Sequence, residues 1–326
     1  MTDRYLFKPL KKWALPSLLI GALLTMPTAA HGLAAGELAD THPVPADHLR
    51  IVTWNLEVFN QRSANPFHKA NPNGPRTADQ LDKLAARIIG FDAAIIALQE
   101  MNDVPALYDL RDRMNGKQAD DGPWKTLALS DSTTRQQNAM LYDSRKVDLV
   151  SGEFAFSTPS AGGYPHEFAY RSPVTGLFSP KGTAETTFRV IGIHGSWQTE
   201  EFRQNQGRWI LAYVTDLLSD PKHPREVILT GDMNGTSASG DHPHEGIVSG
   251  GHLAYIPKQN QEDTAIGGPA IDSFYVTDTA RKRLHNQSSF VVRHDFYGET
   301  ETEFRLVCSD HFPVFIDYFI GKSVDK

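Results

Sequence analysis

The sequence contains almost no cysteine, and this limits how the fold can be stabilised. Cys308 is the only cysteine among 326 residues, so a disulfide within the chain and a cysteine-rich zinc site are both excluded. Stability must come from a hydrophobic core, and a content of 40% hydrophobic residues is sufficient for one. We expect Cys308 to be a small buried side chain at the end of a strand.

A surplus of positive charge is also lacking. The chain has 32 Lys and Arg residues against 39 Asp and Glu residues, which gives a formal net charge of −7. Such a protein has no broad basic field with which to hold nucleic acid non-specifically, and this argues against a DNA-packaging or scaffold role. The charge leaves open an enzyme that binds phosphate groups through a local metal ion.

Several motifs that mark other protein classes are missing. The sequence has no glycine-rich Walker loop and no Cys/His ligand set of the zinc type. It also has no internal repeat of solenoid or propeller length, and no linker divides it convincingly. We therefore interpret the main part of the sequence as one α/β domain, with sheets covered by helices.

The N-terminus lacks an apolar run long enough to cross a membrane and has the pattern of a secretory signal peptide. Basic residues within 1–12 precede an interrupted apolar run at 13–26, and small residues follow at 28–30. A membrane anchor, the alternative, needs about 20 apolar residues. We predict that residues 1–30 are a signal peptide cleaved near Ala30. The mature protein is then secreted or periplasmic, with no stable membrane insertion.

Behind this segment, a short lead-in precedes one long patterned region. Residues 31–48 are rich in Ala, Gly, Pro and His and form a loose lead-in, whereas strand and helix signals continue from 49 to 322. Thr77 and Gln80 predict a capping box for a helix that stops at Gly90. Strands are predicted at 49–58, 93–98, 124–129, 138–142, 147–150, 187–193, 227–229, 271–276, 290–292 and 314–319.

Two more helices are predicted, one on each side of the middle of the chain. Asp103 caps the first, which has Pro105 in its first turn and ends at Gly116. The second helix is predicted to carry Phe202, Trp209, Ile210, Tyr213 and Leu217 on one face.

Polar side chains gather where the predicted strands begin or end. They lie in the segments 53–57, 98–100, 194, 231–235, 272 and 309–311. Each segment alone has a structural explanation; Gly-Asp-x-Asn-Gly, for example, is a good turn sequence. Asp272 is the exception, because a carboxylate inside an apolar strand needs a partner. Taken together, the segments predict an active site at one edge of the sheets.

The residue types in these segments point to phosphate chemistry. Carboxylate and amide oxygens are the ligands that Mg²⁺ or Mn²⁺ prefers. Aspartate beside histidine supplies the proton-transfer and charge-stabilising groups that cleavage of a phosphate ester requires. The sequence therefore predicts an exported phosphoesterase that depends on a divalent metal ion.

In these segments the chain resembles the endonuclease/exonuclease/phosphatase superfamily, which has the deoxyribonuclease-I-like fold. The matching motifs occur in the family's order and are Thr-Trp-Asn-Leu-Glu at 53–57, Ala-Leu-Gln-Glu at 97–100, Ile-Gly-Ile-His at 191–194, Gly-Asp-Met-Asn at 231–234, Ile-Asp-Ser-Phe at 271–274 and Ser-Asp-His at 309–311. The resemblance implies a catalytic domain at 49–322. It also implies a four-layer α-β-β-α sandwich, with two packed mixed β-sheets flanked by helices.

The resemblance also implies a metal and substrate set. Glu100 corresponds to the principal metal ligand, and Asp310 and Glu57 complete the metal environment. Asn55 is expected beside the metal as a substrate-binding residue, and Arg135 as a phosphate contact.

The catalytic roles that the resemblance implies fall on five residues. Asp232 corresponds to the group that orients or deprotonates the attacking water, and Asn234 holds that water or the phosphate. His311 is expected to donate to a phosphate oxygen, oriented by Asp272. His194 resembles the second histidine of the deoxyribonuclease-like branch.

The substrate is less determined than the chemistry, because the superfamily cleaves DNA, RNA, sphingomyelin and phosphoinositides with nearly the same core. Specificity is expected from the loops 60–76, 157–185 and 236–268. Our first hypothesis is a monomeric nuclease acting on DNA or RNA. The alternatives are a phosphatase, a sphingomyelinase or phosphoinositide-type enzyme, or a non-catalytic binding protein on the same fold.

Overall fold

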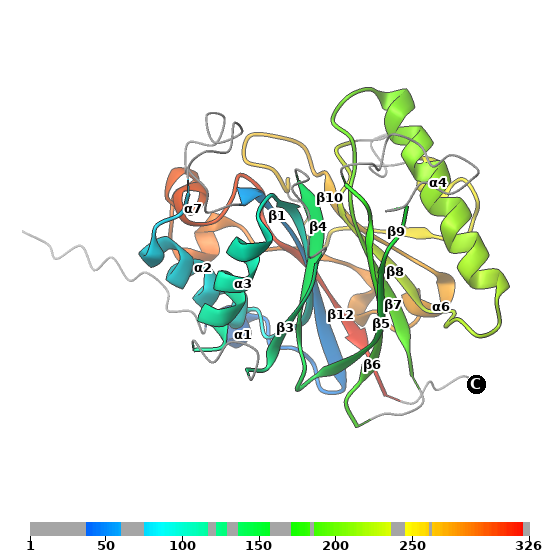
Figure 1. The fold of residues 1–326 in the computed structure, drawn as a ribbon, viewed down its shortest axis with the longest axis horizontal. Coiled ribbons are helices and arrows are strands. Elements are labelled where there is room, and N and C mark those ends of the chain that lie inside the picture. Colours follow the sequence, from blue (N-terminus) through cyan, green and yellow to red (C-terminus); the bar gives the residue numbers. More distant parts are fainter. Residues whose placement is uncertain are drawn as a thin grey trace, which may run out of the picture. The chain divides into compact units, whose positions relative to one another are not determined.

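Two six-stranded β-sheets lie at the centre of the fold in the computed structural model (Figure 1). The structure describes residues 37–59, 75–116, 122–128, 136–156, 171–182, 186–235, 245–260 and 263–321. Two of the predicted specificity loops need correction, because 157–185 contains a strand at Val174–Pro180, and 236–268 contains a short helix at Glu245–Val248 and a strand at Ala254–Ile256. The predicted signal peptide, Arg135 and most of the predicted loops 60–76 and 157–185 lie outside the described residues. They remain predictions.

The first sheet has the strand order β11-β12-β1-β2-β4-β3. Its strands are β1 (His48–Phe59), β2 (Ala93–Met101), β3 (Trp124–Leu127), β4 (Gln137–Asp143), β11 (Phe290–Val291) and β12 (Val314–Phe319). β1 and β2 are parallel, and every other neighbouring pair is antiparallel. The parallel pair is joined through helix α2 (Ala78–Gly90), because a parallel crossover needs a long connection.

The second sheet repeats this plan with the order β5-β6-β7-β8-β10-β9. Its strands are β5 (Val147–Phe154), β6 (Val174–Pro180), β7 (Phe188–His194), β8 (Val227–Asp232), β9 (Ala254–Ile256) and β10 (Asp272–Val276). β7 and β8 form the one parallel pair among these strands and are joined through helix α4 (Glu200–Ser219).

Helices cover the outer faces of both sheets (Figure 1). α1 (Glu37–Thr41), α2, α3 (Val104–Met114) and α7 (Glu301–Val307) lie against the first sheet, and α4 lies against the second. The remaining short helices are α5 (Glu245–Val248), α6 (Asp278–Arg281) and the 3₁₀ turns η4 (His285–Gln287) and η5 (His294–Tyr297). This arrangement confirms the predicted four-layer α-β-β-α sandwich.

Local sequence signals account for several of these elements. The Thr77 side chain accepts from the backbone of Gln80, whose side chain bonds the backbone of Thr77, as predicted for a capping box. Ala93 to Leu98 is fully buried, as expected for a strand covered on both faces. Asp103 occupies the N-cap position of α3, but its side chain makes no capping hydrogen bond.

Two details of the sequence predictions need correction. The buried face of α4 consists of Gln206, Gly207, Ile210, Val214 and Leu217, and Trp209 is 37% exposed. The buried stripe of this helix therefore shares Ile210 and Leu217 with the predicted face but does not include Trp209. Cys308 is buried as expected, but it lies at the C-cap of α7 and not at the end of a strand. Burial raises the pKa of the Cys308 thiol to about 11.

The inner faces of the two sheets share one hydrophobic core. It includes Met140 and Tyr318 from the first sheet and Phe188, Val190 and Phe274 from the second, and the rings of Tyr318 and Phe188 lie 4.9 Å apart. Such close packing of two inner faces fixes the register between the sheets. Polar groups at the sheet edges are therefore held at fixed positions relative to one another.

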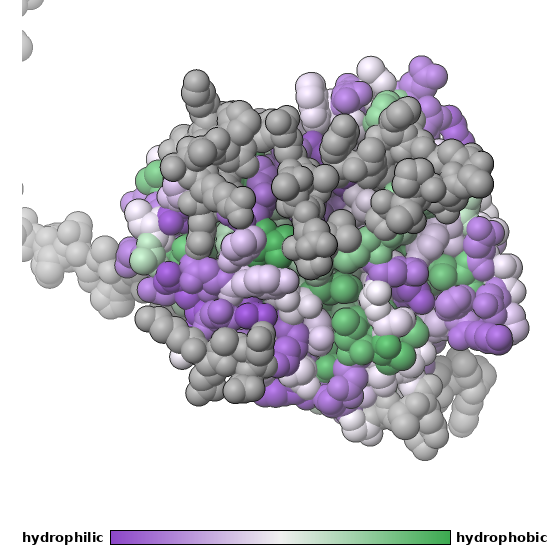
Figure 2. Space-filling model, viewed as in Figure 1, coloured by the Kyte–Doolittle hydropathy of each residue, from purple (hydrophilic) through white to green (hydrophobic). Residues whose placement is uncertain are grey.

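The surface follows from these layers. In Figure 2, the outer helical layers are mainly hydrophilic, whereas hydrophobic side chains lie over the strands between them. The edge strands β3 and β5 lie close together. A Cβ atom on Gly152 of β5 would lie 2.7 Å from Cδ1 of Leu127 of β3. Within the described residues, we find no helix that combines the length and the apolar content needed to cross a membrane.

Candidate active site

The strand topology brings the predicted polar segments to a single edge of the sandwich. The parallel strands β1 and β2 end at this edge, as do β7 and β8. Their antiparallel neighbours β12 and β10 begin there, since Val314 pairs with Thr53 and Asp272 pairs with Asp232. Segments that are far apart in the sequence thus meet where the strands stop.

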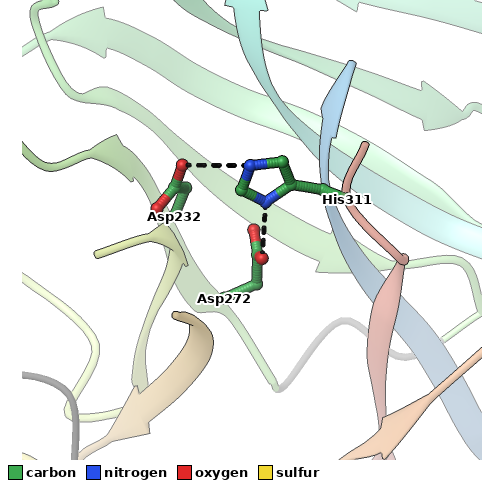
Figure 3. A group of neighbouring side chains, drawn as sticks. All are labelled: Asp232, Asp272 and His311. Atoms are coloured by element: carbon green, nitrogen blue, oxygen red, sulfur yellow. Dashed lines mark hydrogen bonds and ion pairs between the residues drawn. The ribbon is translucent and has the colours of Figure 1, made fainter. Parts of the chain in front are cut away.

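His311 lies between two carboxylates at this edge (Figure 3). Its Nδ1 is 2.8 Å from Oδ2 of Asp272, and its Nε2 is 3.8 Å from Oδ2 of Asp232. All three residues are buried. The core also fixes the histidine backbone, because the indole of Trp54 donates to the carbonyl of His311 at 2.8 Å.

The two carboxylates determine the charge of this histidine. Burial lowers the pKa of His311, but Asp272, Asp232 and Asp310 together outweigh burial and raise its pKa well above the ordinary value. Burial raises the pKa of Asp232 to about 7, against the opposing charge of His311. The imidazole is therefore a charged donor held in place by Asp272.

Asn55 connects this group to the first sheet. Its Nδ2 donates to Oδ2 of Asp232 at 3.0 Å and lies 3.4 Å from Oε1 of Glu100. The other oxygen of Glu100 accepts from the backbone N–H of Val58 at 2.8 Å. Burial raises the pKa of Glu100, and the like charge of Asp310 acts in the same direction. The N–H of Val58 and the positive charges of His311 and Arg171 act in the opposite direction, so it is mainly burial that disfavours the negative charge of this carboxylate.

The backbone is unusual at the ends of β1 and β2. Glu57, Val58 and Glu100 have φ values of +45°, +49° and +59°. Residues other than glycine rarely adopt this region, and for the β-branched Val58 it is a genuine outlier. Strain of this kind is found at functional sites that the surrounding fold holds in place.

Glu57 and Asp310 share a cation from α7. The guanidinium of Arg305 forms a two-pronged ion pair with the carboxylate of Glu57 and lies 3.6 Å from Oδ2 of Asp310. The charge of Glu57 is thus already neutralised by a neighbour. We therefore leave Glu57 out of the ligand set that we propose below, although the sequence predicted it there.

The charge balance of the site fits a divalent cation. Asp272 is paired with His311, and Glu57 with Arg305, which leaves Glu100 and Asp310 without a full counter-charge. Two hard carboxylates are donors of the type that Mg²⁺ prefers, whereas the amide oxygen of Asn55 accepts from the backbone N–H of Glu57 at 3.0 Å. Asp232, Asp272 and His311 also have donor atoms within 4.8 Å of one another, but their mutual bonds occupy the imidazole Nδ1.

His194 and an arginine that the sequence did not single out complete the site. Nε2 of His194 lies 3.5 Å from Oδ2 of Asp232 and 3.7 Å from Oε1 of Glu100. Arg171 donates through Nη1 towards His194 Nε2 at 3.2 Å and to the carbonyl of Gly195 at 2.9 Å. Burial, then the charges of Arg171 and His311, hold the pKa of His194 well below its ordinary value.

The Gly-Asp-Met-Asn turn places Asn234 in contact with Asp232 and with the loop that follows β7. The backbone N–H of Asn234 donates to Oδ1 of Asp232 at 2.8 Å, and its Nδ2 donates to the carbonyl of Gly195 at 3.0 Å. Gly231 is required here, because its φ is +146° and a Cβ atom would lie 1.9 Å from the carbonyl oxygen of Ile193. The turn and the strand end of β7 therefore fit against each other.

The structure brings most of the predicted residues together. Those at the common edge are Asn55, Glu57, Glu100, His194, Asp232, Asn234, Asp272, Asp310 and His311. Sequence reasoning missed Arg171 and Arg305. Arg171 stands three residues before β6, whose first residue, Val174, pairs with Gly192 near the end of β7. The antiparallel pairing of these strands is the signal that places it beside His194.

Comparison with known proteins agrees with this geometry. A model of the Endonuclease/Exonuclease/phosphatase family matches residues 52–324. Among solved structures, the chain is similar to an endonuclease/exonuclease/phosphatase family protein from Bacteroides thetaiotaomicron, with 19% identity, a TM-score of 0.58 and coverage of 83% of this chain and 97% of that chain. A search of curated proteins found no match.

Two other similar structures have more specific names. One is a Bacteroides thetaiotaomicron mannosyl-6-phosphatase, with 19% identity, a TM-score of 0.54 and coverage of 82% of this chain and 98% of that chain. The other is D. rerio TDP2 complexed with a single-strand DNA product, with 14% identity, a TM-score of 0.57 and coverage of 83% and 98%. At these identities the likeness shows the fold alone.

The charge balance makes a prediction about metal binding. We expect Glu100→Gln to weaken Mn²⁺ binding by at least about tenfold, since loss of even an outer-shell partner typically costs about 10- to 100-fold. Glu57→Gln is the matched control and should leave the affinity close to wild type, because Arg305 already pairs with this carboxylate. Titration followed by electron paramagnetic resonance measures both. A larger loss in Glu57→Gln than in Glu100→Gln would contradict the assignment.

Proposed function

The chain belongs to the endonuclease/exonuclease/phosphatase family of metal-dependent phosphoester hydrolases, and we propose that it is a phosphodiesterase that cleaves DNA or RNA. The observation that carries the proposal is the position of His311 between Asp232 and Asp272, at the edge where Glu100 and Asp310 lie. This set holds a proton donor and a proton acceptor close enough to act on one phosphate.

His311 and Asp232 have complementary roles in this proposal. The charged imidazole donates from Nε2 to a phosphate oxygen, while Asp272 holds the opposite ring nitrogen. Asp232 accepts a proton from the attacking water, because it lies 3.8 Å from the same imidazole nitrogen and burial favours its protonated form. Asn234 orients Asp232 through its backbone N–H.

We assign metal binding to Glu100 and Asp310, with Asn55 beside them. A divalent cation bound there, Mg²⁺ or Mn²⁺ in our proposal, would neutralise charge on the phosphate and so lower the repulsion that an approaching water meets. The chain's own contribution is to hold Glu100 through the Val58 N–H and Asn55. Arg305 keeps Glu57 and Asp310 from repelling each other.

Two further groups support a phosphate ester as the substrate. Arg171 and His194 lie next to each other in the second sheet's half of the edge, where Nε2 of His194 is within 4 Å of both Asp232 and Glu100. A guanidinium is suited to bridging phosphate oxygens. The similar structure of TDP2 with a DNA product is consistent with nucleic acid. The similar mannosyl-6-phosphatase favours the alternative, a phosphatase acting on small phosphate monoesters.

A substrate panel tests the proposal. Purified mature protein with Mg²⁺ is expected to cleave single-stranded DNA, double-stranded DNA or RNA, and to lose this activity with EDTA and regain it with added Mg²⁺. His311→Ala and Asp232→Ala should each lower turnover by about 100-fold or more. Far-UV circular dichroism should show that both variants remain folded.

The matched control for this test is His223→Ala, because His223 lies in the connection between α4 and β8, outside the site. It should retain wild-type turnover. Hydrolysis of a sugar phosphate or of sphingomyelin, with no cleavage of nucleic acid, would reject the nuclease in favour of an alternative. Near-wild-type turnover of His311→Ala would reject the assigned roles.

We also propose that the protein is exported, secreted or periplasmic, because residues 1–30 have the pattern of a signal peptide. Expression of the full chain in a secretion-competent host should yield an exported protein whose mass corresponds to a start near residue 31. A version without residues 1–30 should stay inside the cell. An intact chain starting at Met1 in the membrane fraction would contradict the proposal.

A further inference from the structure

Trp197 is exposed to an extent that the fold does not explain. It is 70% exposed, the largest value among the exposed large hydrophobic residues of the described chain. Trp54 and Trp124 are buried, and Trp209 is 37% exposed. Single apolar side chains at the surface are common. Exposure alone therefore does not indicate a binding function for Trp197, and its position relative to the active site has to be considered.

The loop that carries Trp197 is tied to the active site. It begins directly after His194, and the carbonyl of Gly195 accepts from Arg171 at 2.9 Å and from Asn234 at 3.0 Å. The N–H of Gly195 donates to the carbonyl of Asp232 at 2.7 Å. A Cβ atom on Gly195 would lie 2.4 Å from the carbonyl oxygen of Met233. Glycine therefore allows the loop to lie against the catalytic turn.

The rest of the loop is held just as firmly. The N–H of Ser196 donates to the buried Gln206 at 2.8 Å, and the N–H of Gln198 donates to the hydroxyl of Ser196 at 3.1 Å. Thr199 accepts from the N–H of Phe202 and caps α4. The backbone on both sides of the indole is thus fixed in advance, which lowers the entropy cost of binding a ligand on it.

We propose that Trp197 is the stacking platform for a nucleobase adjacent to the scissile phosphate. This inference rests on the proposed nuclease function. Nucleobases stack on exposed aromatic rings whatever the sequence, because every base has a π-face. The acidic chain offers no broad basic field for a polynucleotide. Stacking on this loop, whose Gly195 carbonyl accepts from Arg171, therefore supplies affinity where net charge does not.

A base fits this position better than a sugar ring does. A sugar on an aromatic ring also needs polar side chains to bond its hydroxyl groups. The hydroxyls of Ser196 and Thr199 and the amide oxygen of Gln206 already accept from the backbone of the loop and of α4. Trp197 is the exposed large hydrophobic residue of this loop, and its indole is the flat surface on which a base can stack.

The test compares a normal oligonucleotide with one in which abasic sites replace the bases next to the scissile phosphate. On the normal substrate, Trp197→Ala should raise KM by about 5- to 150-fold, with little change in kcat. Trp197→Phe should recover most of the loss. On the abasic substrate, wild type and Trp197→Ala should have equal KM values. Trp209→Ala, which removes another indole from the surface, should match wild type on both.

Each other result has a definite meaning. If the wild type cleaves nucleic acid and Trp197→Ala has an unchanged KM, or an equal loss on both substrates, the stacking role is wrong and the nuclease function stands. If the wild type cleaves no nucleic acid, the proposed function fails, and this inference fails with it. A raised KM for a sugar phosphate in Trp197→Ala would make the indole a sugar platform and would overturn the assignment to a base.

Discussion

The ion pair between Asp272 and His311 is the interaction on which the site depends. Asp272 begins β10 in the second sheet, and His311 precedes β12 in the first, so the pair forms across the sandwich. Both side chains are buried, and a buried charge is tolerated only with a partner. The packing of the two sheets and the chemistry of the site therefore require the same register.

The other charged residues of the site lie around this pair. Their arrangement lets the site bind a phosphate group without a large excess of Lys and Arg residues on the protein surface. Arg305 neutralises Glu57, and the remaining carboxylates Glu100 and Asp310 suit a divalent cation. This explains how an acidic chain can act on phosphate esters. In our proposal, recognition of the substrate is local, through the cation, Arg171 and the platform Trp197, and does not need a basic surface.

The sequence could predict most of the fold but not all of the site. Strand ends and helix caps are local signals, so sheets covered by helices and the edge that holds Glu100, Asp232 and His311 were accessible. The four-layer sandwich followed only from the resemblance to the family. Arg305 was not, because its partner Glu57 is 248 residues away and only tertiary packing brings α7 to β1. A capping box at Thr300 marks the start of α7, but it cannot show which carboxylate the helix will face.

A kinetic double-mutant cycle on Asp272 and His311 tests this account most directly. Turnover of one phosphodiester is measured for wild type, Asp272→Asn, His311→Ala and the double variant. If Asp272 acts only by holding the imidazole, the double variant should be no slower than His311→Ala alone, which loses about 100-fold or more. Losses that multiply in the double variant would show that the two residues act independently and would contradict the account.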